Sequence, residues 1–245
     1  MVRRANVLIV ILLASIALLL VACGKDSATT KAGARSPAAP ATATTPAVAP
    51  RSTKDGCTAV PPPQPAATPT RKRSKLKLSR KRAWTATIKT NCGTIAIRLA
   101  VGRAPKTTSA WAGLARNRFF DGLTFQRIAK PGGNDFVIQG GDPEGTGNGG
   151  PGYSVVEAPP KSTRYTRYVA AMAKTQTDAP GTSGSQFFIV TAADSGLPPD
   201  YALLGEVVGS KAAVKRISAV PTDPTSEAPL DPVVMSSVRI TSAAR

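Results

Sequence analysis

Eight short runs of alternating, β-branched or aromatic residues recur along the chain beyond residue 83. Turns rich in glycine and proline separate them, and the runs occupy residues 84–90, 94–99, 123–128, 136–140, 169–173, 186–190, 203–208 and 233–241. Alternation with a period of two residues is typical of strands that bury one face. Because many short strands leave exposed edges unless the sheet closes on itself, we expect a mainly β fold, a closed eight-stranded antiparallel barrel.

Two other segments have the periodicity of helices. Pro105 stands near the first turn of residues 105–116, and Trp111 and Leu114 share one face of that segment. Residues 210–218 carry a similar apolar stripe. We expect these two helices to cap the barrel.

The chain contains no histidine and only three cysteines, Cys23, Cys57 and Cys92. The absence of histidine excludes a Ser-His-Asp triad, a Cys-His nucleophile and any metal site that relies on imidazole. The cysteines are too few and too scattered for a zinc site. We therefore predict neither a metal nor a cofactor.

Residues 145–150 read Gly-Thr-Gly-Asn-Gly-Gly and satisfy the G-x-G-x-x-G pattern of dinucleotide sites. That pattern works only when a helix follows, because the helix N-terminus holds the pyrophosphate. Here Pro151 and Gly152 follow, and no helix can start as required. Nucleotide binding is therefore not expected.

The N-terminus is typical of a secretory signal. Arg3 and Arg4 precede an apolar run over residues 7–21, which is shorter than the roughly 20 residues of a comfortable membrane span. The run ends in Leu-Val-Ala-Cys-Gly, which resembles a bacterial lipobox. We expect residues 1–22 to be a lipoprotein signal peptide, and Cys23 to hold an extracytoplasmic protein on a bacterial membrane through acyl chains. An uncleaved anchor with an incidental cysteine is the alternative.

A stretch poor in large apolar residues follows the signal. Residues 25–70 are mostly Ala, Pro, Thr and Ser, and such a segment buries too little apolar area to offset its ordering entropy. It leads into a basic run, Arg71 to Arg82, which carries eight of the chain's 32 lysines and arginines. We assign residues 23–82 to a disordered stalk that ends in this run, and residues 83–245 to the folded domain.

Two interpretations of the basic run stay open. It binds a polyanion, such as anionic lipid headgroups or cell-wall polymers, or it only keeps the stalk soluble. Nucleic acid is disfavoured because we expect the chain to be exported.

Cys57 and Cys92 also leave two interpretations open. An even pair of cysteines suggests a disulfide in an oxidising compartment, and two free thiols are the alternative.

Three segments follow one another within the predicted domain. The first runs from FDGLTFQRI, residues 120–128, to FVIQGGDP, residues 136–143; the others are GTGNGGPGY, residues 145–153, and AMA, residues 171–173, leading to GSQFFI, residues 184–189. In this order they resemble the cyclophilin family of peptidyl-prolyl isomerases. The resemblance extends over about residues 84–241 and implies the barrel fold of that family.

The resemblance also implies a site. Arg127 matches the catalytic arginine of the family, and Gln139 matches the glutamine that braces the arginine and contacts the substrate. The proline pocket corresponds to Phe136, Val137, Phe188, Leu197 and Tyr201. The neighbouring groove corresponds to Ala173, Thr175 and Gln186.

The expected chemistry needs no nucleophile. Isomerisation of an X-Pro bond has a barrier of about 20 kcal/mol because rotation breaks amide resonance. A guanidinium can stabilise the twisted amide by donating a hydrogen bond to the prolyl nitrogen. The resemblance thus implies a peptidyl-prolyl cis-trans isomerase that assists the folding of exported proteins. The alternative is a non-catalytic chaperone or scaffold that binds proline peptides at the cell surface.

Some positions depart from the usual residues of the family. Lys174 replaces an asparagine, and Gly196 stands where many members have a tryptophan. Leu204 replaces a common phenylalanine, which we expect to enlarge the pocket. Residues 130–135 form a longer insertion than in compact members, and we expect it to displace Phe136 slightly.

Overall fold

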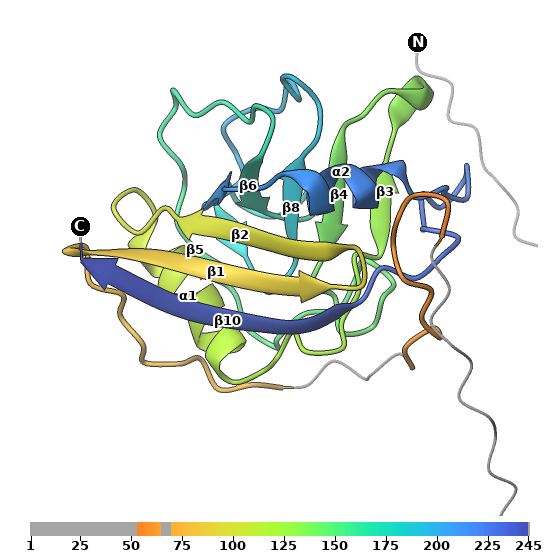
Figure 1. Cartoon of the computed structure of the whole chain (residues 1–245). Helices are drawn as coiled ribbons and strands as arrows, with labels where there is room; N and C mark the ends of the chain where they lie inside the picture. The colour runs from red at the N-terminus through yellow and green to blue at the C-terminus, as the bar shows by residue number, and fades with distance from the viewer. Residues whose placement is uncertain (1–52, 65–69, 245) are drawn as a thin grey trace, which may run out of the picture. The chain divides into compact units, whose positions relative to one another are not determined.

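An eight-stranded antiparallel sheet forms the body of the computed structural model, which describes residues 53–64 and 70–244 (Figure 1). From one edge to the other, the strands are β10 (Met235–Ala244), β1 (Arg82–Thr90), β2 (Gly93–Leu99), β9 (Leu203–Val208), β6 (Val169–Met172), β8 (Phe187–Val190), β4 (Val137–Gly140) and β3 (Arg127–Ala129). All neighbouring pairs are antiparallel. This architecture confirms the predicted fold class. The predicted signal peptide and Cys23 lie outside the described residues.

The two edges of the sheet meet. The backbone N–H of Gly122 donates to the carbonyl of Met235 at 2.8 Å, and the N–H of Met235 donates to the carbonyl of Leu123 at 2.8 Å. The N–H of Phe125 donates to Val233 at 2.9 Å. The chain that leads into β3 is therefore paired with the start of β10, and backbone groups that an open edge would leave unpaired are satisfied.

Aliphatic and aromatic side chains fill the barrel, and two helices cover it. Helix α1 (Pro105–Arg116) packs against β9 and β10, and helix α2 (Ala212–Ala219) packs against β2 and β4. From α1, the ring of Trp111 stacks on Phe120 at 4.7 Å between centroids and meets the edge of Phe187 at 5.5 Å. None of the helices within residues 53–64 and 70–244 has the length and apolar character needed to cross a membrane.

Most of the predicted strands and helices are present. The differences occur in segments that are too short to show a clear periodicity. The strand expected over residues 123–128 is reduced to β3, because residues 122–125 bond to the start of β10 instead. Two two-residue strands, β5 (Val155–Val156) and β7 (Thr182–Ser183), pair with each other and were not predicted, since two residues show no period. Helix α2 begins at Ala212, whose N–H donates to the hydroxyl of Ser210 at 3.3 Å.

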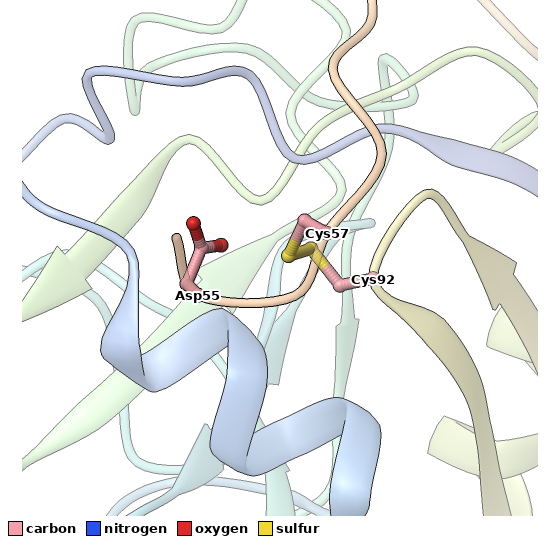
Figure 2. Close-up of side chains that lie close together, drawn as sticks. All are labelled: Asp55, Cys57 and Cys92. Carbon is pink, nitrogen blue, oxygen red and sulfur yellow. A yellow bond between two sulfur atoms is a disulfide. The ribbon is translucent and has the colours of Figure 1, made fainter. Parts of the chain in front are cut away.

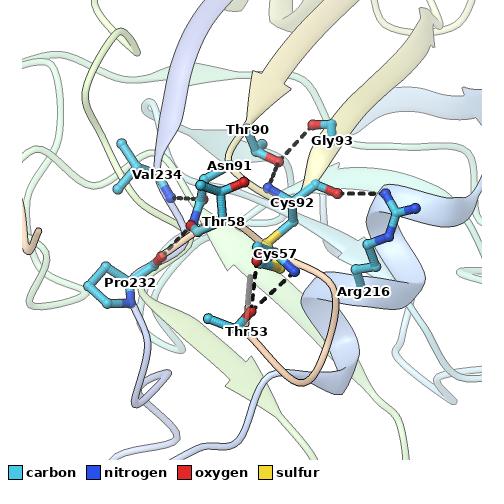
Figure 3. The surroundings of a disulfide bond; sticks show 10 residues. All are labelled: Thr53, Cys57, Thr58, Thr90, Asn91, Cys92, Gly93, Arg216, Pro232 and Val234. Atoms are coloured by element: carbon cyan, nitrogen blue, oxygen red, sulfur yellow. Dashed lines mark hydrogen bonds between the residues drawn. A yellow bond between two sulfur atoms is a disulfide. The ribbon is translucent and has the colours of Figure 1, made fainter. Parts of the chain in front are cut away.

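The folded part of the chain begins before the predicted boundary at residue 83. Cys57 is joined to Cys92 in a disulfide, and both residues are buried in the main core (Figure 3). The side-chain amide of Asn91 donates to the carbonyl of Thr58 at 2.8 Å, and Arg216 of α2 donates to the carbonyl of Cys92 at 3.2 Å. Residues 53–64 therefore belong to the domain and not to a free stalk.

The basic run is packed against α1 and is not an unattached linker. The N–H of Leu78 donates to the hydroxyl of Ser109 at 3.1 Å, and Leu78 is only 5% exposed. The side chain of Ser74 comes so close to Gly113 that a β-carbon there would lie 2.5 Å from it. Sequence patterning missed this contact because a run so rich in charge carries only two apolar anchors, Leu76 and Leu78.

Candidate active site

Sheet register places the predicted catalytic residues in one row across adjacent strands. Arg127 on β3 lies opposite Gln139 on β4, Gln139 lies opposite Phe188 on β8, and Phe188 lies opposite Ala171 on β6. Side chains alternate between the two faces of a sheet. Ile138, next to Gln139, points into the main core, so the row of Arg127, Gln139 and Phe188 lies on the outer face of the barrel.

Gln139 connects the arginine to the loop that follows β4. The Nη1 group of Arg127 donates to Oε1 of Gln139 at 3.3 Å, and Nε2 of Gln139 donates to Oε1 of Gln186 at 2.9 Å. In turn, Nε2 of Gln186 donates to the carbonyls of Gly147 and Gly149 at 2.8 and 2.9 Å. Each amide thus uses its acceptor and its donor in one chain of bonds, which orients the guanidinium.

A carboxylate that sequence reasoning missed completes this arrangement. Nε of Arg127 donates to Oε2 of Glu227 at 2.6 Å, and the two side chains are 38% and 28% exposed. Glu227 lies 100 residues further along the chain, in the loop between α2 and β10. No local pattern marks such a partner, because only the closure of the barrel brings this loop next to β3.

The predicted walls of the proline pocket form a second apolar cluster, separate from the main core. Val137 and Phe188 are buried in it, and Phe136, Leu197 and Tyr201 are partly buried against it. The ring of Tyr201 meets Phe188 edge-on at 5.4 Å between centroids. A partly open apolar cluster beside a guanidinium suits a pyrrolidine ring, which has no polar group of its own.

Tyr165 is buried in the same cluster, supports a wall of the pocket and was also not predicted. Its hydroxyl donates to the carbonyl of Tyr201 at 2.5 Å and accepts from the N–H of Tyr201 at 3.0 Å. Burial raises the pKa of Tyr165 to about 12, so the hydroxyl keeps its proton at neutral pH. The bond to the carbonyl of Tyr201 therefore holds one pocket wall in place.

The predicted groove residues line a cavity of about 560 Å³ beside the row. Ala173, Thr175 and Gln186 border it together with Lys174 and Asp178. Nζ of Lys174 donates to the carbonyls of Thr175 and Asp178, both at 3.1 Å, and lies 5.6 Å from the ring of Tyr201. Hydrogen bonds from the side chain and backbone of Thr175 lower the pKa of Asp178. The groove is therefore lined largely by polar side chains, whereas the proline pocket is lined by apolar ones.

Two of the departures from the family pattern have structural consequences. Leu204 is fully buried in the main core and not in the pocket cluster, so the prediction that it enlarges the pocket is wrong. The alternation along β9 explains this, since its neighbour Leu203 faces the pocket side. The insertion at residues 130–135 folds back, and the hydroxyl of Ser218 donates to Asp135 at 2.8 Å.

The cluster of Asp55, Cys57 and Cys92 is a crosslink and not a metal centre. Its potential ligand atoms lie within 4.8 Å of one another, which is close enough to hold an ion. Figure 2 shows, however, that the two sulfurs are bonded to each other. Metal binding requires thiolates, and a disulfide offers none.

Comparison with known proteins agrees with this geometry. Residues 85–240 match the family described as "Cyclophilin type peptidyl-prolyl cis-trans isomerase/CLD". Peptidyl-prolyl cis-trans isomerase B of Streptomyces anulatus is 38% identical over 171 residues, which cover 62% of this chain and 94% of that protein. Peptidyl-prolyl cis-trans isomerase A of Mycobacterium tuberculosis is 38% identical over 174 residues, with 64% and 91% covered.

A solved structure is also similar. It is a cyclophilin-type peptidyl-prolyl cis-trans isomerase of Cryptosporidium parvum, crystallised in the presence of the dipeptide Ala-Pro. The TM-score is 0.58 at 28% identity, and the match covers 65% of this chain and 99% of that one. The chain described here therefore belongs to the family of cyclophilin-type peptidyl-prolyl cis-trans isomerases.

Proposed function

We propose that this protein catalyses the cis-trans isomerisation of X-Pro bonds, and that Arg127 is the catalytic group. One observation carries the proposal: a guanidinium braced by Gln139 stands in the same row as Phe188, a wall of the apolar pocket. Two bacterial relatives at 38% identity bear the name of this activity.

The pocket and the arginine have different roles in the proposed reaction. Phe136, Phe188 and Leu197 hold the pyrrolidine ring, while the carbonyl before it rotates out of the amide plane. Rotation localises the lone pair on the prolyl nitrogen, and a free N–H of Arg127 donates to it. This hydrogen bond strengthens only as the amide twists, so it lowers the barrier and not the energy of the bound ground state. Arginine suits this task because it stays charged and presents several fixed donors.

The residues that precede proline in the substrate lie along the groove of Ala173, Thr175 and Gln186. The similar protein crystallised with Ala-Pro supports a proline peptide as the ligand class. The oriented arginine favours catalysis over mere binding, because a proline-binding scaffold would not need it. The deciding measurement is the isomerisation rate of an X-Pro peptide with the full chain; a rate equal to the uncatalysed one would contradict the proposal.

In the same proposal the domain works outside the cytoplasm, on exported polypeptides, and Cys23 anchors it by lipid. The support is the signal-like N-terminus and the Cys57–Cys92 disulfide, since disulfides persist in oxidising compartments. Replacing Cys23 with Ser should release the protein from the membrane fraction of a bacterial host. Continued membrane partition at the mature mass would argue against lipidation.

The basic run is proposed to contact surfaces that carry anionic phosphate groups. Arg73, Lys75 and Lys77 are exposed, and they alternate with Ser74, Leu76 and Leu78, which are half-buried or buried. In the described part of the chain, none of the cations in residues 71–82 forms an ion pair within 4 Å. Packing against α1 thus holds these charges in place at little further entropic cost.

Neutralising three of these cations should weaken binding to vesicles that contain anionic lipid. The variant Arg73→Gln, Lys75→Gln, Lys77→Gln is expected to lose roughly 100-fold in affinity at low salt, at about 1 kcal/mol per cation. Binding of the unmodified chain should fall as salt rises. The matched control replaces Lys54, Lys161 and Lys215 with Gln in the same way; these three lysines are exposed and lie outside the basic run. Equal losses in both variants would mean that net charge, and not the basic run, drives binding.

A further inference from the structure

We infer that Glu227 is a positioning residue that holds the guanidinium of Arg127 in its working orientation. The inference rests on the proposed isomerase function of Arg127. Its basis is the ion pair between Nε of Arg127 and Oε2 of Glu227, which at 2.6 Å is the shorter of the two contacts of this guanidinium. Among the described residues, no other carboxylate forms an ion pair with Arg127.

The two contacts use different edges of the guanidinium. Glu227 accepts from Nε, and Gln139 accepts from Nη1. An arginine has five N–H donors in a rigid plane, so three remain, two on Nη2 and one on Nη1. One bond alone would leave the plane free to pivot about that bond. Two acceptors on separate edges fix the plane and direct the remaining donors to one side, where the substrate amide would lie.

The loop that carries Glu227 is itself held in shape. Oδ1 of Asp223 accepts hydrogen bonds from the N–H groups of Thr225 and Ser226 at 3.0 and 2.7 Å, and these bonds lower the pKa of Asp223. The N–H of Glu227 donates to the carbonyl of Asp223 at 2.9 Å. Glu227 is therefore presented by a small internally bonded turn.

This turn is also tied directly to the strand of the arginine. The N–H of Ile128 donates to the carbonyl of Glu227 at 2.9 Å, one residue after Arg127. Glu227 has φ of +58°, a left-handed conformation that is uncommon for residues other than glycine and costs roughly 1 kcal/mol or more. The backbone bond to Ile128 holds residue 227 in this conformation, and its carboxylate then lies next to Arg127.

The ion pair is not primarily a stability device. Both side chains are more than a quarter exposed, and ion pairs open to solvent contribute little to folding. Its consequence is instead the orientation of the donors, so its loss should lower kcat more than it raises KM. We expect the variant Glu227→Gln to lose about 10-fold in kcat, below the roughly 100-fold that a 1 Å misplacement of a catalytic group can cost.

The test compares the full chain with Glu227→Gln and Glu227→Ala by two independent readouts. The first is the isomerisation rate of an X-Pro peptide, separated into kcat and KM. The second is the NMR signal of the Arg127 Nε–H, which should exchange slowly with water in the unmodified chain, faster in Glu227→Gln and fastest in Glu227→Ala. Glu227→Ala should lose more kcat than Glu227→Gln, because the amide still accepts a weaker, uncharged hydrogen bond.

A matched control breaks another ion pair of the same kind. The side chain of Asp121 accepts a hydrogen bond at 3.0 Å from Arg239, which lies on β10. The variant Asp121→Asn removes this ion pair, and it should change neither the isomerisation rate nor the Nε–H signal of Arg127. In an Arg127→Lys background, Glu227→Gln should cause no further loss. Backbone NMR spectra of Glu227→Gln establish that the variant is folded.

The outcomes separate this inference from the proposed function. If the unmodified chain does not catalyse, the proposed function fails, while the Nε–H signal still tests the positioning contact. If Glu227→Gln is folded and keeps its kcat, or loses kcat with an unchanged Nε–H signal, the positioning role is wrong. A slower kcat together with a rapidly exchanging Nε–H supports it.

Discussion

Replacing Arg127 with Ala is expected to lower kcat/KM for X-Pro isomerisation roughly 100- to 1,000-fold, the loss typical of one preorganised donor in an active site. The apolar pocket remains, so the variant should still bind proline peptides. The physical reason is that only the guanidinium acts on the twisted amide, whereas the pocket walls act on ground state and transition state alike. Exchange between cis and trans peptide, measured by NMR on the full chain, reports both the rate and the binding.

Two further variants control this prediction. Arg239→Ala removes an arginine of comparable exposure, 47% against 38%, whose carboxylate partner lies away from the groove, and catalysis should persist. Arg127→Lys keeps the charge but loses the planar guanidinium that contacts Glu227 and Gln139 together. Its kcat/KM should therefore lie between those of Arg127→Ala and the unmodified chain. Full activity of folded Arg127→Ala would exclude the proposed mechanism.

Removing the disulfide should destabilise the domain by about 3–4 kcal/mol, the chain-entropy value for a loop of 35 residues. The double variant Cys57→Ala, Cys92→Ala keeps both side chains small and adds no polar group to the core. For a domain of this size we expect the unfolding midpoint to fall by roughly 10 °C. Thermal and urea unfolding of the full chain, with and without reductant, measures the change.

Reduction of the unmodified chain provides the matched comparison. It should lower the midpoint as far as the double variant does, while reductant should leave the double variant itself unchanged. The folded double variant should retain catalysis, because neither cysteine belongs to the row or the groove. A midpoint insensitive to reductant would indicate that Asn91 and Arg216 hold residues 53–64 in place without the bond.

The fold was predictable where the pattern is long. Helix α1 has the predicted bounds, since Pro105 marks its start and its apolar face is continuous. Strand β9 also has the predicted bounds, over residues 203–208. The pair of β5 and β7 was missed because a two-residue strand has no pattern, and it forms only when distant segments meet. The packing of the basic run was not predicted, because its many charged residues indicate a solvated segment although Leu78 is buried.

The site was predictable in its residue types but not in its contacts. Arg127, Gln139 and Phe188 were expected from resemblance, and register brings them into one row. Glu227 and Tyr165 were not expected, although each touches a predicted site residue. Neither lies in one of the three segments on which the resemblance was recognised, and their contacts join residues that are 100 and 36 positions apart.

By itself, the sequence determined the mainly β class, the two helices and the alternation that separates core from surface along each strand. These properties follow from neighbours a few residues apart, so they can be read locally. Only the tertiary structure decided which strands adjoin, which face Leu204 occupies and which carboxylate meets Arg127. The physical reason is that barrel closure joins segments that are distant along the chain, and their contacts depend on register that no single segment contains.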